Sequence, residues 1–495
     1  MQKLVLPKRY EALEREARDS DLELSRIIQR IDTAANRIEN LLRQVRDGGL
    51  GRFELVLGKS GSGKTTFFRT LQRFFEGIRV ASVPNDVPLT EVANHIRAHS
   101  QWQNTPVIWV MYDRDNPAED KDTIRQFCES LRVLFREDAG RIVLCWPITD
   151  EDKAREISDI AWAIGRDSVV DLDRGVYNFT GVPKQHFYDI ADITSRSLRG
   201  GSLEVFGLTK DVAEPLAVES QTIAEFYTRL EQKSAEINEH YREILKDKTV
   251  PSVWILVGGD DARDLNLTIA TLTQGTQKQV DIDRLLTFLD DPELDAGYLK
   301  EWKKRRAELA YLMRLLDVRI FELPPNVALA AVRAHGSDEA KRNLKLKTVN
   351  PTAADSTFSN AGFVRAIKGE DLSSRAYLRT TEEETANEYR RLQSRARGED
   401  KKFNKALGNA LSRILEDDNV DVQVASEVKA PQGNLKPDIR ISFSTGRVIC
   451  LEPTWRSTGK GIEGELESKQ NTLTVGHIQK YLLEKVLNYV KDLNI

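Results

Sequence analysis

Short apolar runs alternate with longer amphipathic stretches along the first two hundred residues of the chain. The runs are ELVL, IRVASV (78–83), VIWVMY (107–112), RIVLCW (141–146) and SVVDL (168–172). Stretches with helical periodicity separate them, for example 119–135 and 151–164. Apolar runs of this length are typical of strands buried on both faces. Strands that alternate with helices predict a parallel sheet with helices on its faces.

Residues 8–46 predict one long helix with an apolar stripe. The stripe repeats at steps of four and three, through Leu24, Ile28, Ile31, Ala35, Ile38, Leu42 and Val45. This spacing is typical of a seam that packs against another helix. The partner is either in the same chain or in a second subunit. The run Asp47-Gly48-Gly49 ends the predicted helix.

The second half of the chain divides by its hydrophobic pattern. Helices are predicted at 183–199, 217–247 and 280–318, and PSVWILVGG (251–259) predicts another buried strand. Residues 337–400 are poor in apolar periodicity and predict a linker. A last compact α/β unit is predicted from a helix at 401–418, strands within 420–428, 436–443 and 447–455, and a closing helix at 475–493.

The length of 495 residues favours two or three domains over a single core. With 40% hydrophobic and 30% charged residues, the composition is that of a globular protein with a charged surface. The net charge of −4 excludes a global basic field, so nucleic acid would be contacted through local patches. Cys128, Cys145 and Cys450 lack metal-ligand spacing and predict buried thiols in a reducing compartment. No apolar stretch is long enough for a membrane span, so we expect a cytoplasmic protein without membrane contact.

The run FELVLGKSGSGKTTFF joins a predicted strand to a predicted helix through a glycine-rich loop. Its motif, G-x-x-x-x-G-K-[ST], is complete and comprises Gly58, Lys59, Ser60, Gly61, Ser62, Gly63, Lys64 and Thr65, with Thr66 next. Glycines let backbone amides turn toward phosphates, and the helix amino terminus adds partial positive charge. In such a loop the lysine reaches the β- and γ-phosphates, and the threonine hydroxyl ligates Mg²⁺. The motif therefore predicts binding of ATP with Mg²⁺.

An acidic residue that holds the magnesium ion is expected at the end of a neighbouring strand. VIWVMYDRD supplies Asp113 for this role. Arg114 stands where a catalytic glutamate usually follows. Asp115 either orients the attacking water or only caps the turn. The arginine predicts slow hydrolysis and leaves the prediction of nucleotide binding unchanged.

Residues 50–200 resemble the P-loop ATPases of the AAA+ and STAND-like group in the loop, the Asp113 strand and the strand rhythm. The resemblance implies ATPase activity and a homo-oligomer. It also implies that Thr149 or Asp150 senses the γ-phosphate. Arginines of this group act in cis or from a neighbour, and Arg196 and Arg199 are candidates, with ordinary surface arginines as the alternative.

Two acidic residues stand at strand edges near the carboxyl end, Asp438 in KPDIRISF and Glu452 in RVICLEPTW. With this order of helix, strands and helix, residues 401–495 resemble the PD-(D/E)xK restriction-endonuclease fold. The resemblance implies that the two carboxylates hold Mg²⁺, which lowers the pKa of a bound water. Gln479 and Tyr481 lie in the helix that often completes such a site. An unrelated α/β domain with surface acids is the alternative.

Thr454 stands where this family has a lysine, two residues after the glutamate. The lysine stabilises developing negative charge. Another cation can replace it, with Lys480 as the first candidate and Lys436 and Arg456 as further ones. Alternatively, threonine is tolerated in an active variant, or the domain binds nucleic acid without cutting it.

The stretches LKEWKKRRAEL (299–309) and HGSDEAKRNLKLK carry local positive charge, with Trp302 in the first. Such patches contact phosphates, and an indole stacks on bases. A solvated helix face is the alternative.

Together these patterns predict an α/β protein with a parallel-sheet P-loop NTPase domain, helical additions and a small restriction-endonuclease-like C-terminal domain. The predicted parts are an N-terminal long helix (1–49), the ATPase domain (50–200), a mixed middle region (201–336), the linker (337–400) and the nuclease-like domain (401–495). The predicted function is ATP-regulated recognition or cleavage of nucleic acid, most simply DNA. By analogy, such pairings serve bacterial defence against phage and plasmids. The alternatives are an ATP-dependent switch or scaffold that binds a partner protein, and an AAA+ transposition-type regulator.

Overall fold

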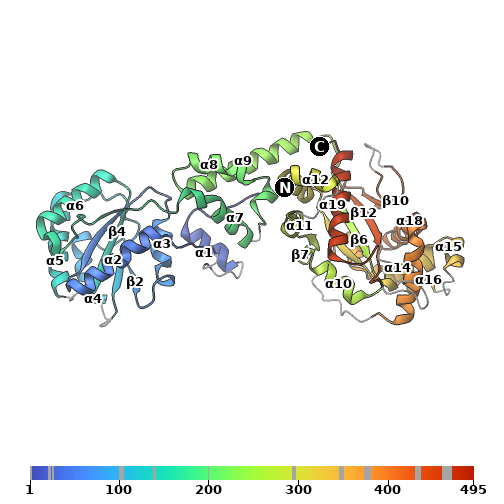
Figure 1. The fold of residues 1–495 in the computed structure, drawn as a ribbon, viewed down its shortest axis with the longest axis horizontal. Coiled ribbons are helices and arrows are strands. Elements are labelled where there is room, and N and C mark those ends of the chain that lie inside the picture. The colour runs from blue at the N-terminus through green and yellow to red at the C-terminus, as the bar shows by residue number, and fades with distance from the viewer. Residues whose placement is uncertain are drawn as a thin grey trace. The chain divides into compact units, whose positions relative to one another are not determined.

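The computed structural model describes residues 3–19, 24, 27–99, 105–137, 141–198, 200–291, 297–344, 350–372, 381–429, 436–459 and 471–494. The chain divides into two compact units, each with a sheet of its own (Figure 1). The N-terminal unit comprises residues 2–203 and 208–235, and the C-terminal unit comprises 204–207 and 236–495. None of the described helices is long and apolar enough to cross a membrane.

The sheet of the N-terminal unit is parallel throughout and has the order β2-β3-β4-β1-β5. Its strands are β1 (Arg52–Leu57), β2 (Arg79–Val83), β3 (Val107–Met111), β4 (Ile142–Ile148) and β5 (Val176–Asn178). The predicted alternation of strands and helices is confirmed here. Because parallel strands need crossover connections, the helices between them cover both faces of the sheet.

The two faces of this sheet are covered by different helices, as the alternation of side chains along each strand requires. Helices α4 (Val92–His99), α5 (Lys121–Glu137) and α6 (Glu151–Gly165) pack on the face that includes Trp109 and Leu144. Helices α2 (Asp32–Gly48) and α3 (Lys64–Thr70) pack on the face that includes Ile108 and Val143. The result is a three-layer α/β/α unit.

The single helix predicted over 8–46 is two helices in the structure, α1 (Tyr10–Asp19) and α2. Helix α1 ends at Asp19, and aspartate favours caps and turns over helix interiors. The predicted seam packs within the chain, because Ile38, Leu42 and Val45 lie in the core beneath the sheet. The expectation that this seam joins a second subunit therefore loses its support.

The α-helices α7 (Phe187–Ser197) and α8 (Lys210–Glu219) and the first part of α9 (Ile223–Ile244) follow β5 in the N-terminal unit. Helix α9 begins in the N-terminal unit and ends in the C-terminal unit, since the division falls after Ala235. Short 3₁₀ turns lie at Leu71–Arg73, Leu89–Glu91, Arg166–Ser168, Lys184–His186 and Leu203–Phe206.

The sheet of the C-terminal unit has seven strands in the order β10-β11-β12-β6-β9-β8-β7. The strands are β6 (Ser252–Gly258), β7 (Thr273–Gln274), β8 (Gln279–Val280), β9 (Arg319–Leu323), β10 (Val422–Ser426), β11 (Ile439–Phe443) and β12 (Val448–Trp455). The central strands β12, β6 and β9 are parallel, and the flanking pairs are antiparallel. Strand β6 is the run predicted at 251–259.

One face of this sheet packs against α14 (Pro325–His335), α16 (Pro351–Ser359), α17 (Gly362–Ile367) and α18 (Glu383–Asp417). The closing helix α19 (Val475–Asp492) contacts Glu452 of β12 and packs with α12 (Gly297–Lys304) and α13 (Arg306–Leu315). The remaining helices are α10 (Ala262–Ala270), α11 (Ile282–Leu289) and α15 (Asp338–Asn343). Because Leu451 and Glu452 are neighbours on a strand, they point to opposite faces.

The stretch 337–400 differs from the predicted linker. It contains α15, α16, α17 and the start of α18, and its Phe358, Phe363 and Tyr389 are buried in the core of the C-terminal unit. Short helices show little hydrophobic periodicity in the sequence, because each presents only one or two turns to the core. The predicted boundary between 201–336 and 401–495 also falls inside one sheet, since β12 pairs with β6 from Ile449 to Trp455.

Candidate functional site

The glycine-rich loop 58–63 joins β1 to α3, as the sequence predicts. Gly61 and Gly63 have φ angles of +79° and +99°, a region that side chains rarely adopt. The backbone at 181 approaches this loop closely, since a Cβ atom added to Gly181 would lie 2.4 Å from the carbonyl oxygen of Ser62. The glycines are thus required by the conformation of the loop and by the segment packed against it.

Lys64, the first residue of α3, is buried with 5% of its surface exposed. Its Nζ atom donates to the carbonyl oxygens of Gly58 and Lys59. Burial lowers the pKa of Lys64, and the carboxylate of Asp115 opposes that shift. A phosphate is the group that would satisfy this buried ammonium, because it offers several anionic oxygens to three donors.

Asp113 and Asp115, the two carboxylates that follow β3, have different surroundings. Burial raises the pKa of Asp115, Lys64 lowers it, and Asp113 raises it further. Asp113 is exposed and has a left-handed φ of +58° in the turn that follows β3. The magnesium role predicted for Asp113 stays a prediction, and Asp115 is a second carboxylate whose pKa is influenced by Lys64.

Arg114 points away from the loop. Its guanidinium donates to the backbone carbonyls of Pro84, Asn85 and Val87, which follow β2. The arginine at the position of the usual glutamate thus fixes a neighbouring turn. Slow hydrolysis stays a prediction.

The two sensor candidates have different surroundings. The backbone N–H of Thr149 donates to the carbonyl oxygen of Asp115 at 2.9 Å, and its hydroxyl lies within hydrogen-bond distance of Asp115 and Asn116. Asp150 instead caps α6, where its carboxylate accepts from the N–H of Lys153 at 3.0 Å. Thr149 is therefore the candidate that lies beside Asp115.

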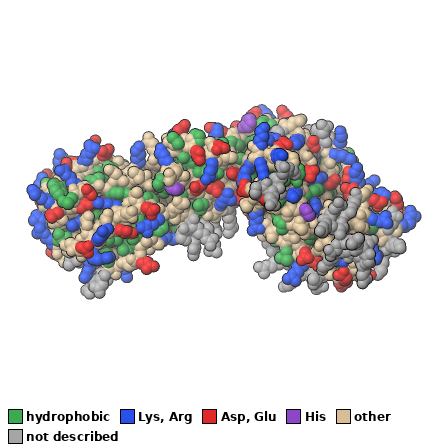
Figure 2. Space-filling view, viewed as in Figure 1, with side chains coloured by type: hydrophobic (Ala, Val, Ile, Leu, Met, Phe, Trp, Pro, Cys, Tyr) green, Lys and Arg blue, Asp and Glu red, His purple; other side chains and the backbone are tan. Residues whose placement is uncertain are grey.

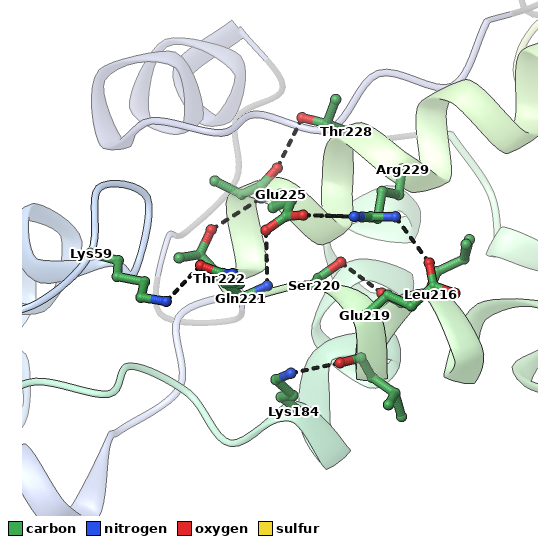
Figure 3. Close-up of polar contacts among 12 residues, drawn as sticks. Lys59, Lys184, Leu216, Glu219, Ser220, Gln221, Thr222, Glu225, Thr228 and Arg229 are labelled. Carbon is green, nitrogen blue, oxygen red and sulfur yellow. Dashed lines mark hydrogen bonds and ion pairs between the residues drawn. The ribbon is translucent and has the colours of Figure 1, made fainter.

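The start of α9 lies against the phosphate loop (Figure 3). Nζ of Lys59 donates to the side chain of Gln221 at 2.6 Å. The hydroxyl of Thr222 accepts from the N–H of Glu225 and caps the helix. A Cβ atom added to Gly61 would lie 2.8 Å from that of Ala224, so the helix and the loop are in direct contact.

An apolar cavity of about 110 Å³ opens beside the loop, within the N-terminal unit. Its wall combines the loop and α3 with the amino-terminal segment before α2 and with α7 and α9, through Gly61, Ser62, Gly63, Thr66, Phe67, Ile27, Ile28, Ile190 and Tyr227 among others. The hydroxyl of Ser62 is buried and has no hydrogen-bond partner among the described residues. Such a cavity, apolar with a few polar groups, is typical of a small-ligand site.

Of the two arginine candidates, Arg196 is paired with Asp192 at 2.6 Å on the same helix. Arg199 lies outside the described residues.

Asp438, just before β11, and Glu452, on the paired strand β12, converge. Nζ of Lys485, on α19, contacts the Glu452 carboxylate and lies 3.8 Å from the carboxylate of Asp438. Tyr489, one turn further along α19, donates its hydroxyl to Glu452. Two strands and a helix therefore bring two carboxylates and one ammonium to one point on the sheet.

Burial and the neighbouring Glu452 raise the pKa of Asp438. Burial alone would lower the pKa of Lys485, but Glu452, Tyr481 and Asp438 raise it. Paired carboxylates in a buried setting need a cation or a proton. Two carboxylates that converge in this way fit a hard divalent ion, because Mg²⁺ prefers carboxylate oxygens. Among the described residues, no group of three or more His, Cys, Asp or Glu could hold a metal ion.

The cation that accompanies the two acids is Lys485, and the prediction of Lys480 for this place is wrong. Lys480 is exposed on α19, and Lys436 pairs with Glu427 at 3.6 Å. Lys480 and Lys485 lie five positions apart on α19, so the helix turns their side chains to different faces. Lys485 interrupts the apolar stripe of Leu482, Val486 and Leu487, and a charged residue on a buried helix face is the signal that could have found it.

The basic stretch at 299–309 is a structural element. Trp302 is buried, and its ring N–H donates to the carbonyl oxygen of Leu483. Arg305 pairs with Glu308, and Arg306 pairs with Glu204. On the face shown in Figure 2, basic and acidic side chains are interspersed. Base stacking on Trp302 is excluded, because the ring is fully packed.

The N-terminal unit has a parallel-sheet α/β fold in which a glycine-rich loop joins β1 to α3. No protein-family model matches the chain, and no curated protein matches its sequence. Among solved structures, the crystal structure of Cdc6p from Pyrobaculum aerophilum is similar to the chain with a TM-score of 0.30 and 11% identity. The match covers 94% of this chain and 97% of that one. A likeness this weak carries no inference about function.

Proposed function

We propose that the N-terminal unit binds ATP with Mg²⁺ at the loop 58–65. The observation that carries the proposal is the apolar cavity beside the loop, because its walls suit a base and the loop suits phosphates. Lys64 would exchange its two backbone carbonyl partners for phosphate oxygens. Thr65 and Asp113 are the groups that would face the metal ion, and Asp115, close to Asp113 in the sequence, is a second carboxylate.

Hydrolysis is proposed to be slow. Arg114 stands where a catalytic glutamate usually follows, and its guanidinium is occupied with backbone carbonyls after β2. Thr149 holds the backbone of Asp115 and would position that carboxylate. A site of this kind suits a switch that stays in the ATP state for a long time.

Titration calorimetry tests the nucleotide site. Lys64→Ala removes the buried ammonium, so the affinity for MgATP should fall at least tenfold, about 1.4 kcal/mol. Lys121→Ala is the matched control, because this lysine of α5 is exposed and lies outside the loop. Equal affinities of wild type and Lys64→Ala would contradict ATP binding at this loop.

We further propose that the C-terminal unit cleaves nucleic acid, most simply duplex DNA, with a divalent metal ion. The convergence of Asp438, Glu452 and Lys485 supports this second function. A bound Mg²⁺ would polarise the phosphate and lower the pKa of a bound water. Asp438 and Glu452 would hold the ion, and Lys485 would stabilise negative charge on the phosphate, the role expected of the family's missing lysine.

Plasmid degradation with Mg²⁺ or Mn²⁺, with and without ATP, tests the cleavage. We expect the wild type to cut and Asp438→Asn to be inactive while remaining folded. Asp421→Asn, which changes an exposed acid of the same unit, is the control and should keep activity. If DNA stays intact under every condition, the unit is better described as a binding module of an ATP-dependent switch.

A further inference from the structure

Arg456 is a buried arginine at the end of β12, four residues after Glu452. Only 8% of its surface is exposed. Glu452, Thr454 and Arg456 alternate with Leu451 and Trp455, which belong to the core on the other face of the sheet. Arg456 therefore points to the side of the sheet that carries the two candidate metal ligands.

Within the part of the chain that the structure describes, the guanidinium of Arg456 has no anionic partner. Among the described residues, no carboxylate lies within 4.0 Å of it, and its one side-chain hydrogen bond runs from Nε to the hydroxyl of Thr454 at 2.9 Å. Buried arginines are normally paired. In this chain, Arg37 pairs with Glu54 and Arg390 with Asp260.

Tyr481 links this arginine to the proposed metal site. The guanidinium carbon of Arg456 lies 5.7 Å from the centre of the Tyr481 ring, and Nζ of Lys485 lies 5.5 Å from the same centre. Two cations thus share one aromatic neighbour, and one of them contacts Glu452. The charge of Arg456, which has no carboxylate partner among the described residues, therefore lies beside the candidate metal site.

We propose that Arg456 binds a backbone phosphate of the nucleic acid next to the one that is cut. The inference rests on the proposed nucleic-acid function of the C-terminal unit. The terminal nitrogens of a guanidinium match two phosphate oxygens, and Nε is already held by Thr454. Thr454 is then a positioning residue, and this gives a reason for a hydroxyl where a lysine was expected.

The test measures binding of the full-length protein to a short fluorescent DNA duplex in EDTA, over a range of salt concentrations. Arg456→Gln should weaken binding and make the slope of log K against log salt shallower by about one, as loss of one phosphate contact requires. Arg456→Lys should keep the slope and reduce the affinity, because the positive charge remains and the bidentate hydrogen bonding of the guanidinium is lost. Thr454→Val should also keep the slope and reduce affinity.

Arg413→Gln is the control, since this arginine of α18 is exposed and pairs with Asp355. The proposal is overturned if Arg456→Gln, with a melting temperature like that of the wild type, keeps the wild-type slope and affinity. It is overturned as well if the wild type does not bind DNA. If the protein binds DNA through Arg456 but never cuts it, only the proposed cleavage is contradicted. If the wild type cuts DNA and Arg456→Gln leaves the salt slope unchanged, only the proposed phosphate contact is contradicted.

Discussion

Single residues in this chain take positions in space that their places in the sequence do not reveal. Thr454 stands where the family resemblance implies a lysine, yet Glu452 has an ammonium partner in Lys485, which is 33 positions away along the chain. Likewise, Arg114 stands at the place of a glutamate and holds backbone carbonyls of another turn. A motif describes neighbours in sequence, whereas a site needs neighbours in space.

The ion pair of Glu452 and Lys485 gives a prediction at this scale. Glu452 is 2% exposed, so Lys485→Met leaves a buried carboxylate without its cation. We expect the free energy of unfolding to fall by up to about 3 kcal/mol, because the buried carboxylate of Glu452 would lose the cation that compensates its charge. Urea unfolding followed by circular dichroism measures the loss.

Lys480→Met is the matched control for this measurement, because Lys480 is an exposed lysine of the same helix. Its effect should stay within about 0.5 kcal/mol. Equal stability of the two variants would show that Lys485 does not neutralise Glu452 in solution.

At the scale of elements, the contact between the phosphate loop and α9 is the feature that couples two parts of the N-terminal unit. The helix starts at Ile223, and its first turn reaches Gly61 through Ala224. Lys59 and Gln221 add a hydrogen bond between the same two elements (Figure 3). A change of loop conformation on nucleotide binding would therefore be felt at the start of α9.

Gly61→Ala tests this contact. The added Cβ atom would meet that of Ala224 at 2.8 Å and would sit at a φ of +79°. Gly77→Ala is the control, with a φ of +73° and nothing within 4 Å of the added atom. The control should lose about 1 kcal/mol of stability from its left-handed backbone alone.

We expect Gly61→Ala to lose more stability than the control and also to bind MgATP more weakly in calorimetry. The reason is that either the loop or the helix must move to accept the new methyl group. Wild-type affinity for MgATP in Gly61→Ala would show that the loop and α9 are not tightly coupled.

At the scale of the whole molecule, the two units differ in how their parts are connected. The N-terminal unit is continuous in sequence for nearly its whole length, and its sheet follows the predicted alternation. The C-terminal unit collects strands from two distant regions, since β6 and β9 precede α14–α18 and β10–β12 follow them. Comparing plasmid degradation with and without ATP tests whether nucleotide binding in the N-terminal unit changes cleavage by the C-terminal unit.

The sequence alone was sufficient to predict the phosphate loop, the parallel sheet and helices around it, and the strands that carry Asp438 and Glu452. These features depend on local pattern: apolar runs, glycine spacing and the residues that end a strand. The partition of 337–495 was not predictable in this way. Short helices such as α17 show too few turns for a period to emerge, although Phe363 is fully buried.

Only the tertiary structure decided which distant groups meet. The pairing of β12 with β6 joined two regions that local pattern keeps apart, because strand partners are chosen by packing and hydrogen bonding between segments rather than within them. The same packing set α19 against β12 and brought Lys485, not Lys480, to Glu452. The rotation of a helix against its sheet depends on the whole buried interface, so it is fixed only when the entire unit has folded.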